Sequence, residues 1–275
     1  MSLELFKKVL NDYSAIGGGA LSLTPVVGDV FLDKYLVDRI KLLKNYENIN
    51  DISFTTNAIA SDKLTDKELS FILTNLKRIY ISIYGIDAEE SLAITRKHNY
   101  SRALQNIHRI ISLTANPQKI QLGFRCIKKH DKNTIQAWIN QHFGFKIAFD
   151  HIDSYANWGG AIDVRNHLPF HGKWQPVKEN LSQCLIPLIA AQIYSNGDIS
   201  FCPCCDYDSV HELHLGNIKK NSFSDIYNGE KTATLWNFEK AQIPSFCKFC
   251  SFHISLNDLQ RYEFMFENPY PIVGG

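Results

Sequence analysis

Apolar residues recur along the first two-thirds of the chain in two alternating patterns. In the first, they fall three or four positions apart, as at Leu3, Phe6 and Leu10, which is typical of a helix with one buried face. In the second, they gather in short runs rich in Ile, Phe, Thr and Tyr, which predict strands. The predicted strands cover residues 20–24, 52–56, 79–84, 120–127 and 146–152.

Helical segments separate these strands. One, marked by Leu32 and Leu43, follows the first strand, and another runs from about Thr65 to Leu76 with a capping box at its start. Strands that alternate with helices indicate βαβ units, and hence an α/β fold with a parallel sheet covered by helices. The chain nevertheless begins with a helix, which Ser2 can cap. In a βαβ unit the helix follows a strand, and no predicted strand precedes this helix.

Glycine and polar residues collect where the predicted strands end. Gly28 and Asp29 follow the first strand, Asn57 follows the second, Ser82 lies in the third, and residues 157–160 follow the fifth. Any one of these positions suits an ordinary loop or cap. Because ligands of parallel α/β folds bind at the carboxyl ends of the strands, the four groups together predict a shared pocket.

Composition excludes several classes of protein. The chain has 275 residues, 45% of them hydrophobic and 21% charged, and its net charge is +1. This composition is typical of a globular protein. The near-zero charge gives no electrostatic case for binding nucleic acid or an anionic membrane. No stretch reaches the roughly 18–20 apolar residues of a membrane span, and the N-terminus does not resemble a signal peptide. We therefore expect a cytoplasmic protein, in which cysteines are metal ligands or reactive thiols rather than disulfides.

The cysteines are concentrated in the last third of the chain. Cys126 is expected in the core of a strand, and the other six are Cys184, Cys202, Cys204, Cys205, Cys247 and Cys250. A predicted hairpin, from residue 189 to 202 with its turn at 195–198, brings separated cysteines together. Two of its thiolates and two from the Cys-x-x-Cys at 247–250 would complete a four-sulfur site. That site suits Zn²⁺ or an iron–sulfur cluster, and spacing does not separate the two; buried structural thiols are the alternative.

These residues together resemble the radical S-adenosylmethionine (radical SAM) enzymes that carry a C-terminal SPASM or twitch-type auxiliary-cluster domain. The motifs of the resemblance are residues 23–29, 54–57, 81–87 and 157–160, then Cys184-x12-Gly197-x4-Cys202, residues 215–218 and 222–227, and Cys247-x2-Cys250. The resemblance implies a partial (β/α) barrel over residues 1–175, missing its first strand. A small Cys-rich SPASM/twitch-like domain would follow over residues 176–275.

The resemblance also implies site residues and partners. S-adenosylmethionine would be bound by Gly28, Asp29, Asn57, Ser82 and Arg96. One auxiliary 4Fe–4S cluster, with zinc as the alternative, would be held by Cys184, Cys202, Cys247 and Cys250, and Cys204 or Cys205 could substitute. The implied partners are a peptide or small-molecule substrate and an electron donor protein.

One departure limits what the resemblance implies. The family's defining Cys-x3-Cys-x2-Cys motif, which holds the cluster that cleaves S-adenosylmethionine, occurs nowhere in these 275 residues. We therefore expect an N-terminally incomplete or degenerate member that is inactive alone. The chemistry of an intact relative would be modification of a peptide or small substrate by a 5′-deoxyadenosyl radical. The alternative function is a non-catalytic binding module whose C-terminal segment is held together by zinc or by a cluster.

Overall fold

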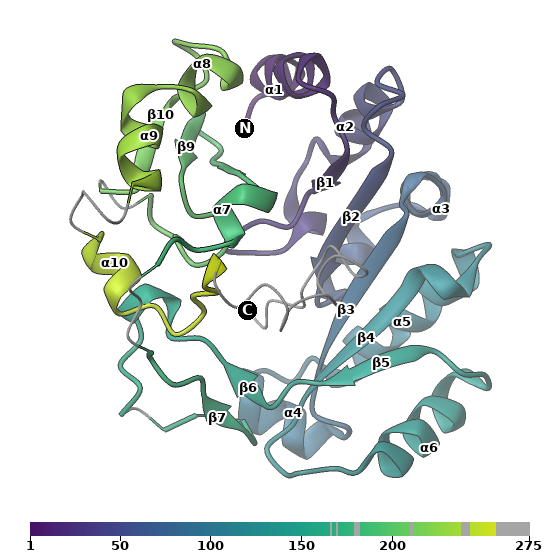
Figure 1. The fold of residues 1–275 in the computed structure, drawn as a ribbon. Helices are drawn as coiled ribbons and strands as arrows, with labels where there is room; N and C mark the ends of the chain where they lie inside the picture. Colours follow the sequence, from purple (N-terminus) through teal and green to yellow (C-terminus); the bar gives the residue numbers. More distant parts are fainter. Residues whose placement is uncertain (166, 169, 179–181, 210–211, 238–242, 257–275) are drawn as a thin grey trace. The chain divides into compact units, whose positions relative to one another are not determined.

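The computed structural model describes residues 1–165, 167–168, 170–178, 182–209, 212–237 and 243–256 (Figure 1). These residues form two compact units. The sheet unit comprises Gly17–Asp153 and Leu168–Gly172, and the cysteine unit comprises Met1–Ile16, Ser154–His167 and the described residues from Lys173 onward. The cysteine unit is therefore discontinuous in sequence. The domain boundary expected between residues 175 and 176 stays a prediction.

The sheet unit contains a five-stranded parallel sheet in the order β1-β2-β3-β4-β5. The strands are β1 (Ala20–Ser22), β2 (Asp51–Thr56), β3 (Arg78–Tyr84), β4 (Ile120–Arg125) and β5 (Ala148–His151). Each new strand lies beside the one before it, and every connection crosses over through helical segments. All five strands predicted from the sequence are confirmed, with their ends shifted by one or two residues.

Helices connect these strands, and Figure 1 shows α3, α5 and α6 along one side of the sheet. The helices are α2 (Leu36–Leu43), α3 (Asp66–Asn75), α4 (Ala88–Thr95), α5 (Tyr100–Leu113) and α6 (Lys132–Phe143), with three short 3-10 turns, η1 (Val30–Leu32), η2 (Ile59–Lys63) and η3 (Pro117–Lys119). The helix expected from Leu32 is wrong at its start. The carboxylate of Asp33 accepts the backbone N–H of Tyr35 at 3.0 Å, and such a turn competes with helix, so α2 begins only at Leu36.

The strand register separates polar from apolar side chains. Paired residues of neighbouring strands share a face, and alternate residues of one strand lie on opposite faces. One face of the sheet carries Ser53, Thr55, Tyr80, Ser82, Tyr84, Gln121, Arg125 and Asp150, and we name it the polar sheet face. The other carries the buried residues Ile52, Phe54, Ile79, Ile81, Ile83, Leu122 and Phe124. The apolar face forms the core of the unit.

The capping box predicted at the start of α3 is present. The Thr65 hydroxyl accepts the backbone N–H of Glu68 at 3.3 Å, and the Glu68 carboxylate accepts the backbone N–H of Thr65 at 2.8 Å. These hydrogen bonds hold the pKa of Glu68 below its usual value.

We expect Thr65→Ala to lower the free energy of unfolding by about 1 kcal/mol, because a helix N-terminal amide loses its partner. Urea denaturation of the purified chain measures this. Thr74→Ala is the matched control, since the Thr74 hydroxyl only donates to the Ser70 carbonyl within the same helix. Equal losses in the two variants would contradict the role given to the cap.

The cysteine unit is built from short elements. A three-stranded antiparallel sheet has the order β10-β9-β8, and a parallel pair joins β6 to β7. Its elements are α1 (Leu3–Ala15), β6 (Ser154–Tyr155), η4 (Trp158–Gly160), β7 (Lys173–Trp174), α7 (Ile186–Ile189), β8 (Gln192–Ile193), β9 (Asp198–Ser200), β10 (His214–Asn217), α8 (Phe223–Tyr227), α9 (Glu230–Trp236) and α10 (Ser245–Lys248). The predicted hairpin is confirmed at β8–β9. Its first strand is shorter than expected, because residue 189 ends a helical turn that Pro187 favours.

The helix that opens the chain belongs to the cysteine unit and not to the sheet. Leu5 and Val9 of α1 pack in one buried cluster with Ile199, Ile218 and Ile226. The carboxylate of Asp12 accepts the backbone N–H of Phe223, at the start of α8, at 3.1 Å. This packing explains why a helix can precede the first strand of a parallel fold.

Candidate functional site

Six thiols converge inside the cysteine unit. Cys205, Cys247 and Cys250 are buried in one core cluster, against which Cys202 and Cys204 pack. Cys184 and Cys204 also pack against a second cluster, formed by Leu185, Ile186 and Ile254. The hairpin strand β9 leads into Cys202, whose sulfur lies 3.5 Å from the backbone nitrogen of Cys205, and α10 carries Cys247. The fold therefore brings together the cysteines that the sequence nominated as ligands, along with both substitutes.

Burial keeps these thiols uncharged when no metal is bound. It raises the pKa of Cys202 to about 12, and the neighbouring thiols of Cys250 and Cys184 add to the shift. Burial also raises the pKa of Cys184. It raises the pKa of Cys247 as well, and the neighbouring thiols of Cys202, Cys250 and Cys184 add to that shift. Thiolates in this core therefore need a cation beside them, and binding of a metal or cluster releases their protons.

The donor set fits an iron–sulfur cluster. A tetrahedral zinc ion with Zn–S bonds of about 2.3 Å places its sulfur ligands about 3.8 Å apart. No three of the six cysteine sulfurs, all within the described residues, lie within 4.8 Å of one another. A four-iron cluster needs a wider cage, because each sulfur binds a different iron. Six converging thiols, three of them buried, supply enough ligands for such a cluster.

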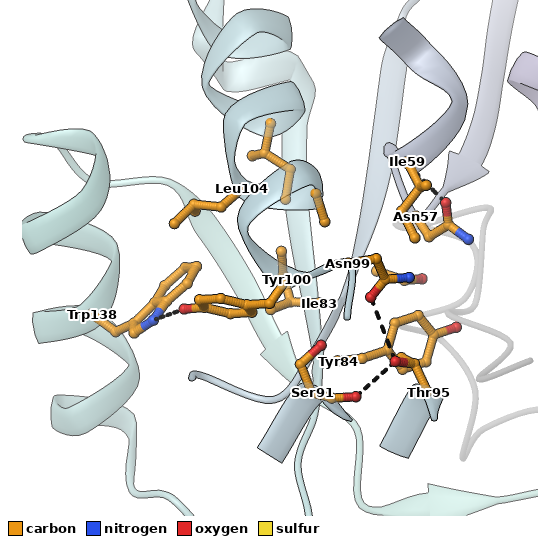
Figure 2. Close-up of a pocket in the computed structure, with 13 residues that line it drawn as sticks. Asn57, Ile59, Ile83, Tyr84, Ser91, Thr95, Asn99, Tyr100, Leu104 and Trp138 are labelled. Carbon is orange, nitrogen blue, oxygen red and sulfur yellow. Dashed lines mark hydrogen bonds between the residues drawn. The ribbon is translucent and has the colours of Figure 1, made fainter. Parts of the chain in front are cut away.

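A small cavity lies in the sheet unit at the carboxyl end of β3 (Figure 2). Its lining includes Asn57 and Ser82, two of the predicted site residues, and side chains of α4, α5 and α6. Trp138 donates to the Ile86 carbonyl at 2.7 Å and to the Tyr100 hydroxyl at 3.3 Å, which fixes one wall. The space open to water is about 30 Å³. That volume holds a few water molecules and is too small for a nucleoside.

The predicted site residue Asp29 ties two segments of the sheet unit together. Its carboxylate accepts from the backbone N–H of Phe31 at 3.0 Å, the Thr56 hydroxyl at 2.8 Å and the Asn57 backbone N–H at 2.9 Å. Asn57 in turn accepts the N–H of Ile59 through its side-chain oxygen at 3.0 Å. Beside them Gly28 is exposed, with a φ of 104° and open space around it. Asp29 therefore shapes the end of β2, and Gly28 leaves its backbone accessible.

The structure pairs Ser82 with an arginine that the sequence did not nominate. Arg125 donates from Nη1 to the Ser82 hydroxyl at 3.2 Å, and its guanidinium lies 5.7 Å from the centre of the Tyr84 ring. Arg125 is only 3% exposed, and its buried Nε has no partner among the described residues. Arg96 is exposed at the end of α4, in a left-handed conformation with a φ of 55°, and it does not line the cavity.

Comparison with known proteins identifies the cysteine core. Residues 184–251 match the model of the SPASM family, described as an iron–sulfur cluster-binding domain. The GTP 3′,8-cyclase of Alkaliphilus oremlandii (strain OhILAs) is 28% identical over 111 residues, which are 40% of this chain. The match spans 33% of the cyclase, so it reaches about a third of that relative's length.

Solved structures match the fold. The crystal structure of BtrN in complex with AdoMet and 2-DOIA has a TM-score of 0.57 and 18% identity, covering 91% of this chain and 80% of BtrN. BtrN in an open conformation has a TM-score of 0.50 and 14% identity, covering 91% and 79%. No helix in the described part of the chain is long and apolar enough to cross a membrane. Residues 184–251 therefore match an iron–sulfur cluster-binding SPASM domain, and the fold of the chain is similar to that of BtrN.

Proposed function

We propose that this chain holds one auxiliary 4Fe–4S cluster in its cysteine unit and binds S-adenosylmethionine in its sheet unit. The convergence of buried thiols in the SPASM segment carries the first half of the proposal. We assign the ligands to Cys184, Cys202, Cys247 and Cys250. When bound, the cluster would supply electron transfer or a coordination site for substrate.

The polar sheet face supports the second half of the proposal. Arg125 and Ser82 would bind the carboxylate of the methionine portion, because a guanidinium beside a hydroxyl suits that group. The free Nε of Arg125 offers a further donor. The exposed backbone at Gly28 and the end of β2 at Asn57 would bind the rest of the cofactor, with Asp29 holding these segments in place.

The same proposal extends to the substrate, the electron donor and the location of the protein in the cell. We assign to the intact system a peptide or small-molecule substrate and a protein electron donor. A core of six cysteines held as thiols and not as disulfides suits the reducing environment of the cytoplasm.

Anaerobic reconstitution of the full chain with iron and sulfide tests the cluster. We expect about four irons and about four sulfides per chain and a brown protein, since one 4Fe–4S cluster occupies the thiols. Zinc without iron would favour the alternative of a zinc-stapled binding module. A content of about eight irons would contradict a single cluster.

We expect the 275-residue chain to bind S-adenosylmethionine without cleaving it. Reductive cleavage needs a cluster in contact with the sulfonium, and these residues lack the Cys-x3-Cys-x2-Cys motif that would hold one. The measurement is 5′-deoxyadenosine by chromatography after reduction of the reconstituted chain with dithionite. Formation of several equivalents per chain would contradict this expectation.

A further inference from the structure

A second set of potential metal ligands lies in the sheet unit, outside the cysteine core. One ligand atom from each of Glu90, Cys126 and His130 lies within 4.8 Å of the other two. Glu90 is in the first turn of α4, and Cys126 and His130 follow β4. All three therefore stand at the carboxyl ends of β3 and β4, the edge at which parallel sheets bind ligands.

The carboxylate of Glu90 is fixed in place by backbone amides. Its Oε1 accepts the N–H of Ile127 at 2.6 Å and of Lys128 at 3.1 Å, and its Oε2 accepts the N–H of Ile86 at 2.9 Å. Glu90 is only 9% exposed. These bonds fix the carboxyl group in a buried position before any cation arrives, and Oε2, which accepts one of them, can also bind a cation.

At the carboxyl ends of β4 and β5, two buried imidazole nitrogens have no hydrogen-bond partner among the described residues. They are Nε2 of His130 and Nε2 of His151. His151 ends β5, stacks on His171 with ring centres 6.2 Å apart, and has a pKa lowered by burial. A buried polar atom without a partner costs free energy, and a bound ion would remove that cost at His130.

An ion pair between Glu90 and His130 does not account for the arrangement. The His130 nitrogen lies 3.5 Å from Glu90 Oε2 and makes no hydrogen bond with it. An ion pair between Glu90 and His130 also gives no role to Cys126, which is fully buried beside them. Ligands about 2.0–2.1 Å from one tetrahedral ion lie about 3.4 Å apart, which is close to the observed separation.

We propose that Glu90, Cys126 and His130 form a mononuclear zinc site. The mixture of carboxylate, thiolate and imidazole suits this borderline ion. As the zinc–sulfur bond forms, the Cys126 thiol loses its proton to water. Three protein ligands leave one position for water or substrate, as in zinc sites that act as Lewis acids.

Zinc titration of the chain after iron–sulfur reconstitution tests the site, because the cysteine core is then filled. We expect about one zinc per chain after dialysis against buffered zinc, with the iron content unchanged. His130→Ala should weaken zinc binding at least tenfold. His98→Ala is the matched control, since His98 is an exposed histidine of the same unit and should leave zinc binding unchanged. A wild-type chain that takes up no zinc, or a His130→Ala chain that retains it, would overturn the proposal.

Cobalt identifies the sulfur ligand independently of activity. We expect Co²⁺ in the reconstituted wild-type chain to show a sulfur-to-cobalt charge-transfer band, which Cys126→Ser abolishes or strongly weakens. Circular dichroism checks that each variant is folded. If Cys126→Ser unfolds, His130→Ala, which changes a partly exposed loop residue, still decides the question. A cobalt spectrum without sulfur character in the wild type would overturn the assignment of Cys126. The iron content tests the auxiliary cluster separately, so the two proposals fail independently.

Discussion

Replacing Cys184 and Cys250 together by alanine is expected to remove most of the iron from the reconstituted chain. The loss of two of four ligands should lower the content from about four irons to less than one per chain. Both residues lie in the converging thiol clusters, and each influences the thiol of Cys202 electrostatically. Iron and sulfide analysis, together with the visible absorption spectrum, measures the effect.

Three further variants make this result specific. Ser245→Ala is the control, because it changes an exposed residue of the helix that carries Cys247, and it should keep the iron. Cys204→Ala and Cys205→Ala should also keep most of it if neither is a ligand. An unchanged iron content in the double variant would end the assignment. Loss of iron in Cys204→Ala or Cys205→Ala would move a ligand to that position.

Arg125→Gln is expected to weaken the binding of S-adenosylmethionine by about tenfold to a hundredfold. A hydrogen bond to a charged group contributes about 1.5–3 kcal/mol, and glutamine removes the charge while keeping a polar side chain. Ser82→Ala should have a smaller effect in the same direction, since it removes only the hydroxyl that Arg125 contacts. Calorimetric titration of the reconstituted chain with S-adenosylmethionine gives the dissociation constants.

The comparison with Arg96→Ala decides between two arginines. The family resemblance implied Arg96 as a residue that binds S-adenosylmethionine, and the structure places Arg125 on the polar sheet face beside Ser82. If Arg125 is the ligand, Arg96→Ala should leave the dissociation constant within about twofold, as expected for a surface position. A larger loss in Arg96→Ala than in Arg125→Gln would return the role to Arg96.

The strands and their parallel arrangement were predictable because the local signals agree with the fold. Capping at Ser2 and Thr65 and the strand-forming runs are set by residues close in sequence, and tertiary packing did not override them. The start of α2 was not predicted, because the side chain of Asp33 favours a turn over the helix that the apolar spacing of Leu32 indicates.

The candidate site was only partly predictable. The cysteines were found because thiols are rare and their spacing is distinctive. Arg125 was missed because its partner Ser82 lies on another strand, and only the register brings them together. A signal was present, since Ile79 to Tyr84 alternates apolar and polar residues, whereas strands buried on both faces are continuously apolar. That alternation predicts one polar face of the sheet, which includes Arg125.

The packing of α1 has a consequence for the order in which the nascent protein can assemble. Helix α1 is synthesised well before its partner, because Phe223 lies 211 residues after Asp12. The sheet unit, encoded between them, has nearly all of its residues available earlier and can fold while translation continues. The apolar face of α1 therefore stays uncovered until Ile199, Ile218 and Ile226 have been made, and it needs protection from aggregation during that interval.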